Sequence, residues 1–438
     1  CAFASAETRG GHMPDIVLTP EDLLVPRAGS GITINGSRNV ASGSSATFTA
    51  SGSDNIRMAV MGLTDRKPTR GEVREMQELL IEAMENGAFG MSSGLAYVPG
   101  AYTDTEDVAE IAKVMADYGG VYATHMRNES FDLIPSVKEA IEIGEKAGVS
   151  VHISHFKAMG RPNWGKVSPA IEEVEKARLR GLRVTADQYP YNCSMSALYP
   201  CVPPHYFAKG MEEALKSFTD PAVRASIKAE MDDPSTPYEN FYLNSGGFSG
   251  VTICTADATK EAEGLTVEAY AKKRNMDPYD AFFDLLIENH GNVSADYHSI
   301  GEDDILSIAA LPFVAIGTDG LVRSMDAKCH PRGWGTMVHA IMEFTRNHPI
   351  MSLEEVIRKM TSLPAEVYGI KDRGLIREGY RADLVVIDES RLNDRATYQE
   401  PNRVALGIPY VFVGGKIALK DGALTGVTNG VFLRKTGR

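Results

Sequence analysis

The sequence lacks the features that would place the protein in a membrane, in an oxidising compartment or on a nucleic acid. No apolar stretch approaches the ~20 residues that a membrane span requires, and the N-terminal residues do not follow the charged-then-apolar pattern of a secretory signal. The five cysteines are odd in number and form no C-x-x-C pair, so a disulfide framework is not expected. The net charge of −13, without any basic run, argues against nucleic acid and anionic membranes as partners. We therefore expect a cytoplasmic protein.

The middle of the chain alternates amphipathic segments with short apolar ones. Helices are predicted at residues 71–86, 105–117, 135–147 and 168–180, and strands at AFGMSSG, VYATH, VHISH, LRVTADQ and FVAIGTD. Repeated strand-then-helix units with apolar strands indicate a parallel sheet covered by helices. The sequence has no glycine-rich phosphate loop of the kind that an open doubly wound sheet often carries. This absence favours a closed, TIM-like (β/α)8 barrel.

Residues that can carry chemistry follow one predicted strand after another. They are Ser92, Tyr97, His125, Arg127, His155, Lys157, Asp187, Tyr189 and Asp319. A barrel gathers such residues on one rim, at the carboxyl ends of its strands. Two strand-end histidines together with Asp319 in a G-T-D-G turn favour a metal site over isolated hydrogen-bonding histidines. Imidazole suits zinc, and a carboxylate beside the metal is well placed to act as a base.

Several motifs resemble, in this order along the chain, those of one enzyme family. ATHMRNE, ISHFKAMG, DQYPYN, IGTDG and HPRGWGT are similar to motifs of the N-acyl-D-amino-acid deacylase (D-aminoacylase) family of the amidohydrolase superfamily. GMSSGLAYVPG and REGYRADLVVID resemble the same family, so the similarity extends from about residue 56 to the end of the chain. The resemblance implies a metal-dependent hydrolase barrel with a small β-sandwich.

The resemblance also implies roles at the metal. His125 and His155 would bind a tightly held Zn²⁺, and Asp319 would be both a metal ligand and the catalytic carboxylate that moves the proton. In the family a cysteine in a Cys-x-Phe-like context completes the tight site. Cys1, in CAFAS, matches this pattern, although a terminal cysteine is otherwise expected to be frayed.

The substrate-binding residues are implied in the same way. A guanidinium matches the α-carboxylate of an N-acyl amino acid, and Arg332 and Lys157 are the candidates. Tyr97 and Tyr189 would donate hydrogen bonds to the scissile carbonyl or to the carboxylate, or else would only pack at the rim. Arg127 and Glu129 are expected to hold the loop after His125 rather than to touch the substrate.

The expected function is zinc-dependent hydrolysis of the amide bond of N-acyl-D-amino acids, which yields a carboxylate and a free D-amino acid. Two alternatives remain at this point. One is another amide or cyclic-amide hydrolase of the superfamily, dihydropyrimidinase-like, although such enzymes use a carboxylated lysine and no strand-end lysine stands in the expected place. The other is an inactive fragment that retains the fold.

The sequence departs from the family pattern near its N-terminus. The expected H-x-H pair of the first barrel strand is absent, since the only histidine before His125 is His12. We therefore expect the first barrel strand to be missing and ATFTASGS to hold the remnant of the third. Residues 1–372 are predicted to form the incomplete barrel, with 205–262 as an insertion or lid. Residues 373–438, with alternating strands and a Gly-Gly turn, are predicted to be the C-terminal half of the β-sandwich.

Overall fold

A parallel sheet of six strands lies at the centre of the computed structural model, which describes residues 50–320 and 330–435. The strands are β1 (Ala50–Gly52), β2 (Gly90–Gly94), β3 (Val121–His125), β4 (Ser150–Ile153), β5 (Val184–Gln188) and β9 (Val314–Ile316). Their order in space follows their order in the chain, and every neighbouring pair is parallel. An open doubly wound sheet reverses its strand order at a switch point, whereas a barrel does not. The strand order therefore agrees with the predicted barrel.

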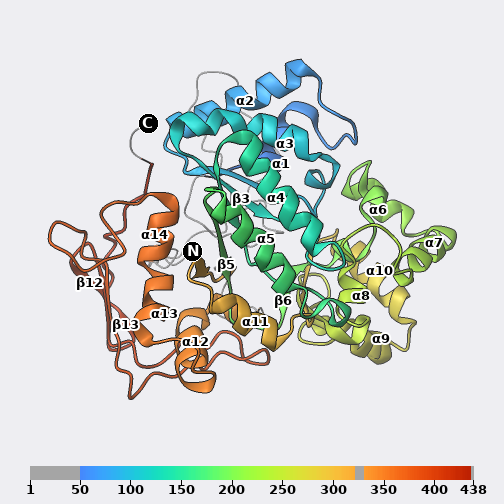
Figure 1. Cartoon of the computed structure of the whole chain (residues 1–438). Coiled ribbons are helices and arrows are strands. Elements are labelled where there is room, and N and C mark those ends of the chain that lie inside the picture. The colour runs from blue at the N-terminus through green and yellow to red at the C-terminus, as the bar shows by residue number, and fades with distance from the viewer. Residues whose placement is uncertain (1–49, 321–329, 436–438) are drawn as a thin grey trace.

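Helices connect the parallel strands and pack against them (Figure 1). They are α1 (Ser53–Met61), α2 (Arg70–Glu85), α3 (Thr105–Ala112), α4 (Leu133–Ala147) and α5 (Val167–Leu179), followed near and after β9 by α11 (Glu302–Ala309), α12 (Thr336–Met342), α13 (Leu353–Met360) and α14 (Ser362–Tyr368). Leu80, Val108, Ile141 and Val174 from four of these helices share one buried core with strand residues such as Val151. Burying each aliphatic side chain of this kind contributes about 2 kcal/mol. This core holds the strand ends in fixed positions.

Two local features of the sequence explain where α2 begins and how closely α4 packs against β4. The Thr69 hydroxyl accepts the backbone N–H of Glu72, and the Glu72 carboxylate accepts the backbone N–H of Thr69, which makes a capping box at the start of α2. Gly144 of α4 faces β4, and a Cβ atom there would lie 2.2 Å from Cγ2 of Val151. Glycine therefore allows the helix to approach the strand this closely.

Between β5 and β9 the chain leaves the parallel sheet and builds a unit on an antiparallel sheet in the order β6-β8-β7. Its elements are β6 (Ser194–Ala197), α6 (Met211–Ser217), α7 (Pro221–Asp232), α8 (Phe241–Asn244), β7 (Val251–Ala256), α9 (Val267–Arg274), α10 (Pro278–Glu288) and β8 (Val293–Tyr297). The predicted insertion, residues 205–262, lies inside this larger unit, which we call the insertion sheet unit (residues 194–297). The strands β6 and β8 of this unit pair across a long stretch of chain, and the bounds 205–262 stay a prediction.

The chain after α14 forms a second antiparallel sheet, on the side of the molecule opposite the insertion sheet unit (Figure 1). Its strands are β10 (Leu384–Val386), β11 (Tyr410–Val413), β12 (Lys416–Lys420) and β13 (Ala423–Leu424), in that order. Gly414 and Gly415, both with positive φ, make the turn between β11 and β12, as the Gly-Gly pair predicts. The sheet falls within the predicted range 373–438, and the division of the chain at residue 372 stays a prediction.

The remaining predictions concern one strand, one helix, Cys1 and membrane-spanning segments. β1 lies within ATFTASGS and pairs with β2, so this segment does contribute a parallel strand. The predicted helix 105–117 is divided into α3 and a 3-10 segment, Lys113–Tyr118. Cys1 lies outside the described residues. Within the described ranges, no helix combines the length and the apolar character needed to cross a membrane.

Candidate functional site

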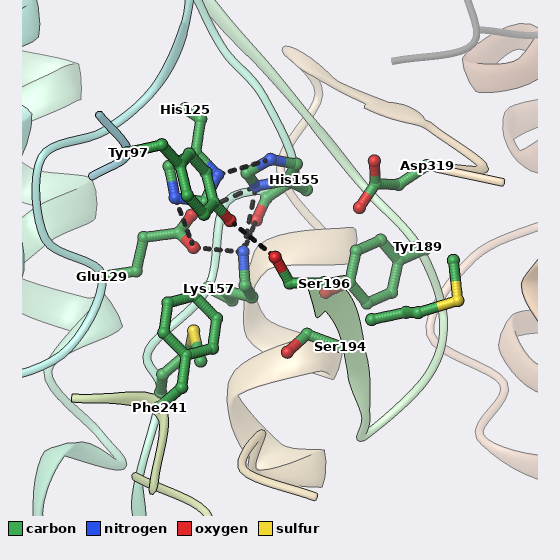
Figure 2. Close-up of a pocket in the computed structure, with 12 residues that line it drawn as sticks. Tyr97, His125, Glu129, His155, Lys157, Tyr189, Ser194, Ser196, Phe241 and Asp319 are labelled. Atoms are coloured by element: carbon green, nitrogen blue, oxygen red, sulfur yellow. Dashed lines mark hydrogen bonds and ion pairs between the residues drawn. The ribbon is translucent and has the colours of Figure 1, made fainter. Parts of the chain in front are cut away.

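A small pocket lies where the parallel strands reach their carboxyl ends (Figure 2). Its lining consists of Tyr97, His125, Glu129, His155, Lys157, Met159, Tyr189, Ser194, Met195, Ser196, Phe241 and Asp319. His125 is the last residue of β3, and His155 and Asp319 follow β4 and β9 closely. The structure thus brings these three residues to one pocket, which is the position expected for residues on the rim of a barrel.

His125 and His155 face each other inside this pocket. Nδ1 of His125 lies 3.0 Å from Nε2 of His155, and the two side chains are only 5% and 4% exposed. Two nitrogens bound at ~2.05 Å to one tetrahedral zinc ion lie ~3.3 Å apart. Burial lowers the pKa of His125 to about 3, so its neutral form, which is the form that binds metal, prevails. The pair is therefore spaced and charged to share one metal ion.

The direction of the His155 side chain depends on an uncommon backbone conformation. The φ angle of His155 is 40°, in the left-handed region that residues other than glycine rarely adopt. Asp187 Oδ1 accepts the backbone N–H of His155 at 2.8 Å, and Asp187 Oδ2 lies 2.8 Å from Nε2 of His152. Although burial opposes ionisation, hydrogen bonding to His152 outweighs it and lowers the pKa of Asp187 to about 2. Asp187 therefore supports the turn that aims His155 into the pocket and does not itself line the pocket.

Glu129 lies behind both histidines and is fully buried. Its Oε1 is 3.1 Å from Nδ1 of His155, its Oε2 is 3.8 Å from Nε2 of His125, and it forms an ion pair with Lys157 (Figure 2). Burial raises the pKa of Glu129, but the charge of Lys157 and the contacts with His125 and His155 outweigh burial and lower this pKa below its usual range. Glu129 thus contacts both histidines from the loop after His125, and the expectation that it does not touch the substrate stays a prediction. The one signal in the sequence is its spacing four residues after His125.

Lys157, predicted to bind substrate, is held within the pocket wall and is 3% exposed. Besides its ion pair with Glu129, its Nζ lies 2.9 Å from Nδ1 of His155 and donates to the carbonyl oxygen of His155 at 3.1 Å. Arg127 is not a lining residue, and it forms an ion pair with Glu139 at 2.8 Å. The two cations that follow the histidines thus take different positions, with Lys157 at the pocket and Arg127 outside it.

Arg332 is not a lining residue, but it forms an ion pair with Asp319, which lines the pocket. Arg332 Nη2 lies 2.9 Å from Asp319 Oδ2, and the two side chains are 1% and 10% exposed. The guanidinium lies 4.7 Å from the centre of the Tyr189 ring. Its Nε and Nη1 are buried and have no hydrogen-bond partner among the described residues. Burial raises the pKa of Asp319, and the charge of Arg332 opposes this rise. A buried guanidinium with two unpaired nitrogens is suited to donate hydrogen bonds to the carboxylate of a ligand.

Hydroxyl groups surround the same space. The Tyr97 hydroxyl lies 3.2 Å from Oγ of Ser196, and the Tyr97 ring centre is 4.7 Å from that of His125. The hydroxyls of Tyr189 and Ser194 have no hydrogen-bond partner within the part of the chain that the structure describes. Burial raises the pKa values of Tyr97 and Tyr189 well above the usual range, so both remain hydrogen-bond donors. The sequence predicted the two tyrosines but not the serines, because β6 was not recognised as a strand.

Three buried apolar side chains complete the lining. Met159 follows β4, whereas Met195 and Phe241 come from β6 and α8 of the insertion sheet unit. All three are at most 9% exposed. They give the pocket an apolar wall beside its charged groups, which is the usual composition of a small-molecule site.

The donors that best fit a metal ion in the described residues are those of His125, Glu129 and His155, which lie within 4.8 Å of one another. Asp319 lines the pocket but is outside this close group. A second buried group contains Cys193, Asp296 and His330. There, His330 Nδ1 accepts the backbone N–H of Arg332 and Nε2 lies 2.8 Å from the carbonyl oxygen of Cys193, so neither imidazole nitrogen is available. The histidine pair is therefore the better site for a metal.

Comparison with known proteins places these features in context. The family model described as "Amidohydrolase family" matches residues 45–419. The chain is 31% identical to the D-aminoacylase of Alcaligenes xylosoxydans xylosoxydans, over 88% of this chain and 69% of that protein. It is 30% identical to the N-acyl-D-glutamate deacylase of the same organism, over 83% of this chain and 64% of that protein. The chain thus spans about two thirds of the length of these relatives.

A solved structure is similar as well. The crystal structure of an N-acyl-D-glutamate deacylase from Bordetella bronchiseptica, complexed with zinc and a phosphonate inhibitor that mimics the tetrahedral intermediate, matches with a TM-score of 0.69. The two chains are 29% identical, and the match covers 83% of this chain and 67% of the other. The predicted barrel-type fold is confirmed by this match together with the parallel strand order.

Proposed function

Because this chain belongs to the amidohydrolase family, in its N-acyl-D-amino-acid deacylase branch, we propose that it hydrolyses the amide bond of N-acyl-D-amino acids. The products are the carboxylate of the acyl group and a free D-amino acid. One observation carries the proposal: a pair of histidine nitrogens 3.0 Å apart and a carboxylate paired with a half-used guanidinium line the same pocket. The first group suits a metal, and the second suits a ligand that bears a carboxylate.

The metal of this proposal is Zn²⁺, held by Nδ1 of His125 and Nε2 of His155. Their spacing and the neutral state of His125 support this assignment. Cys1 is the proposed thiolate ligand, and Asp319 is proposed to complete the site. Zinc bound there would lower the pKa of a water molecule and would polarise the substrate carbonyl. Nitrogen and sulfur donors are those that zinc prefers.

Asp319 is the proposed general base. It accepts a proton from the attacking water and then donates it to the nitrogen of the leaving amine, so that one carboxylate serves both halves of the reaction. Its raised pKa, which results from burial, makes it a better proton acceptor than an exposed carboxylate. Tyr97 remains protonated and lies beside His125, where it can donate a hydrogen bond to the oxygen of the tetrahedral intermediate.

Arg332 is the proposed receptor of the substrate α-carboxylate, through its unused Nε and Nη1. Tyr189, whose ring packs on the guanidinium, and Lys157 support the same carboxylate. The scissile carbonyl and the α-carboxylate then fix two points of the substrate, and the apolar wall receives the side chain as a third. Three fixed points distinguish D from L enantiomers.

The test uses the chain as it stands. We expect the purified protein to contain zinc and to release methionine from N-acetyl-D-methionine, but not from N-acetyl-L-methionine. Zinc content is measured by elemental analysis, and amine release is measured by chromatography. Hydrolysis of a cyclic amide such as dihydrouracil in place of the N-acyl-D-amino acid would overturn the substrate assignment. Bound zinc without any turnover would identify an inactive chain that retains the site. The cytoplasmic location expected from composition belongs to the proposal, and cell fractionation tests it.

A further inference from the structure

Each histidine of the pair turns one nitrogen toward its partner and the other toward Glu129. Nδ1 of His125 and Nε2 of His155 face each other, whereas Nε2 of His125 and Nδ1 of His155 lie 3.8 Å and 3.1 Å from the two oxygens of Glu129. We propose that Glu129 is a positioning residue that orients both histidines toward a shared metal ion. This proposal rests on the proposed function only in taking zinc as that ion.

The chemistry of a carboxylate explains how one residue can orient both rings. A neutral imidazole has one N–H group, and a carboxylate can only accept hydrogen bonds. If Nδ1 of His155 donates to Glu129, the lone pair stays on Nε2, which faces His125. In the same way, Nε2 of His125 would donate to Glu129 and leave the lone pair on Nδ1. This Nε2 has no hydrogen-bond partner among the described residues and lies 3.8 Å from Oε2 of Glu129. Carboxylates behind metal-bound histidines fix the tautomer and the ring orientation in this way.

Lys157 can compete with Glu129 for a hydrogen bond to Nδ1 of His155. Its Nζ lies 2.9 Å from Nδ1 of His155, close enough to donate to that nitrogen. If it did, the imidazole proton of His155 would move to Nε2 and block metal binding. The ion pair between Lys157 and Glu129 gives the ammonium a better acceptor. Glu129 therefore prevents the competing hydrogen bond at the same time as it accepts the productive one.

A second buried carboxyl group, that of Glu239, holds the backbone of Glu129. Glu239 Oε1 accepts the backbone N–H of Glu129 at 2.8 Å, and Glu239 is also buried. Burial, with a further contribution from the charge of Glu129, raises the pKa of Glu239 to about 8. Glu239 thus holds the backbone of Glu129 while remaining neutral at pH 7, and Glu129 alone balances Lys157.

The test measures zinc affinity, which does not require turnover. Competition with a chromophoric chelator gives the zinc dissociation constant of the full chain and of three variants. Removing Glu129 alone would leave a buried ammonium unpaired, and removing Lys157 alone would leave a buried carboxylate unpaired. The two double variants, which carry neither charge, are therefore compared with Lys157→Met and with each other. We expect Glu129→Met/Lys157→Met to bind zinc ~10- to 100-fold more weakly than Lys157→Met, the usual effect of removing such a partner. Glu129→Gln/Lys157→Met keeps a neutral acceptor of the same size and should recover part of this loss.

The matched control is Glu139→Gln, which breaks the ion pair with Arg127 without touching either histidine. It should bind zinc as the unaltered chain does. Equal zinc affinity of Lys157→Met and Glu129→Met/Lys157→Met would overturn the proposal, as would equal affinity of the Gln and Met variants or a failure of the unaltered chain to bind zinc. Turnover is measured separately, so a chain that binds zinc as described but hydrolyses no N-acyl-D-amino acid contradicts only the proposed function.

Discussion

Arg332 donates to Asp319 across 2.9 Å and uses only one of its three guanidinium nitrogens for this contact. The same cation can therefore hold the proposed base with Nη2 and a substrate carboxylate with Nε and Nη1. Base and substrate would be fixed relative to each other by one rigid, planar group.

Asp319→Asn should remove the proton acceptor and preserve the size of the side chain. Since loss of a general base typically lowers the rate by a factor of ~10² to 10⁴, we expect kcat to fall by that factor while KM changes little. Zinc content should change little, because asparagine keeps one oxygen donor and His125, His155 and Cys1 supply the other proposed ligands. Steady-state kinetics at measured zinc occupancy checks this. Near-normal turnover at full occupancy would make Asp319 a structural residue of its turn.

Arg332→Ala should weaken binding of the substrate carboxylate. Truncating one partner of a buried, charge-assisted pair costs about 2–5 kcal/mol, so kcat/KM for N-acetyl-D-methionine should fall by about 30-fold or more. Arg332→Lys keeps the positive charge but lacks the planar fork of donors. Its kcat/KM should therefore lie between those of Arg332→Ala and the unaltered chain. The carboxamide of the same substrate serves as the control. If Arg332→Ala lowers turnover of the amide as much as that of the acid, Arg332 acts through Asp319 rather than on the carboxylate.

Cys1→Ala should weaken zinc binding. Three protein ligands are usual for a zinc ion that keeps a position for water, and two histidines alone hold it less tightly. Zinc retained after dialysis against a chelator is the measurement. Cys201→Ala is the control, because Cys201 is buried in the core of the insertion sheet unit and does not line the pocket. Equal zinc retention by Cys1→Ala and the unaltered chain would exclude Cys1 as a ligand.

The apolar wall predicts the preferred side chain. Met159, Met195 and Phe241 offer no hydrogen bond to a carboxylate, and Lys157, which is paired with Glu129, is the residue proposed to support the α-carboxylate. An acidic side chain would lose its hydration there without compensation. We expect kcat/KM for N-acetyl-D-methionine to exceed that for N-acetyl-D-aspartate by at least ~10-fold. A preference for the acidic substrate would show that a cation outside the described residues enters the site.

Glu239 predicts a change of stability with pH. Its pKa is raised from 4.5 to about 8 in the folded chain, mainly by burial. The folded state therefore binds this proton more tightly than the unfolded state does, and the resulting stabilisation is complete below pH ~4.5 and is lost as the pH rises to ~8. Glu239→Gln keeps the acceptor for the backbone N–H of Glu129 and removes the titration. Its melting temperature, relative to the unaltered chain, should rise from pH 5 to pH 8. A constant difference would mean that Glu239 does not titrate in this range.

The sequence predicted the parts of the site that local pattern encodes. His125 and His155 end apolar segments, and such segments are recognisable without any knowledge of the tertiary structure. The position of Glu129 depends on how the loop after β3 turns back under both rings, and no local pattern specifies this path. Met195 and Phe241 were missed for a related reason. They reach the pocket only because β6 pairs with the distant strand β8.

The residues that line the pocket come from two parts of the fold, the parallel sheet and the insertion sheet unit. The paired histidines, Lys157 and Asp319 lie at or just after the carboxyl ends of parallel strands. The unit inserted between β5 and β9 supplies Ser194, Met195, Ser196 and Phe241. Under the proposed function, substitutions in the insertion would change which substrate side chain is accepted, while the parallel strands would keep the proposed catalytic groups in place. Exchange of residues 194–297 between relatives is a direct route to recombining one chain's selectivity with another chain's chemistry.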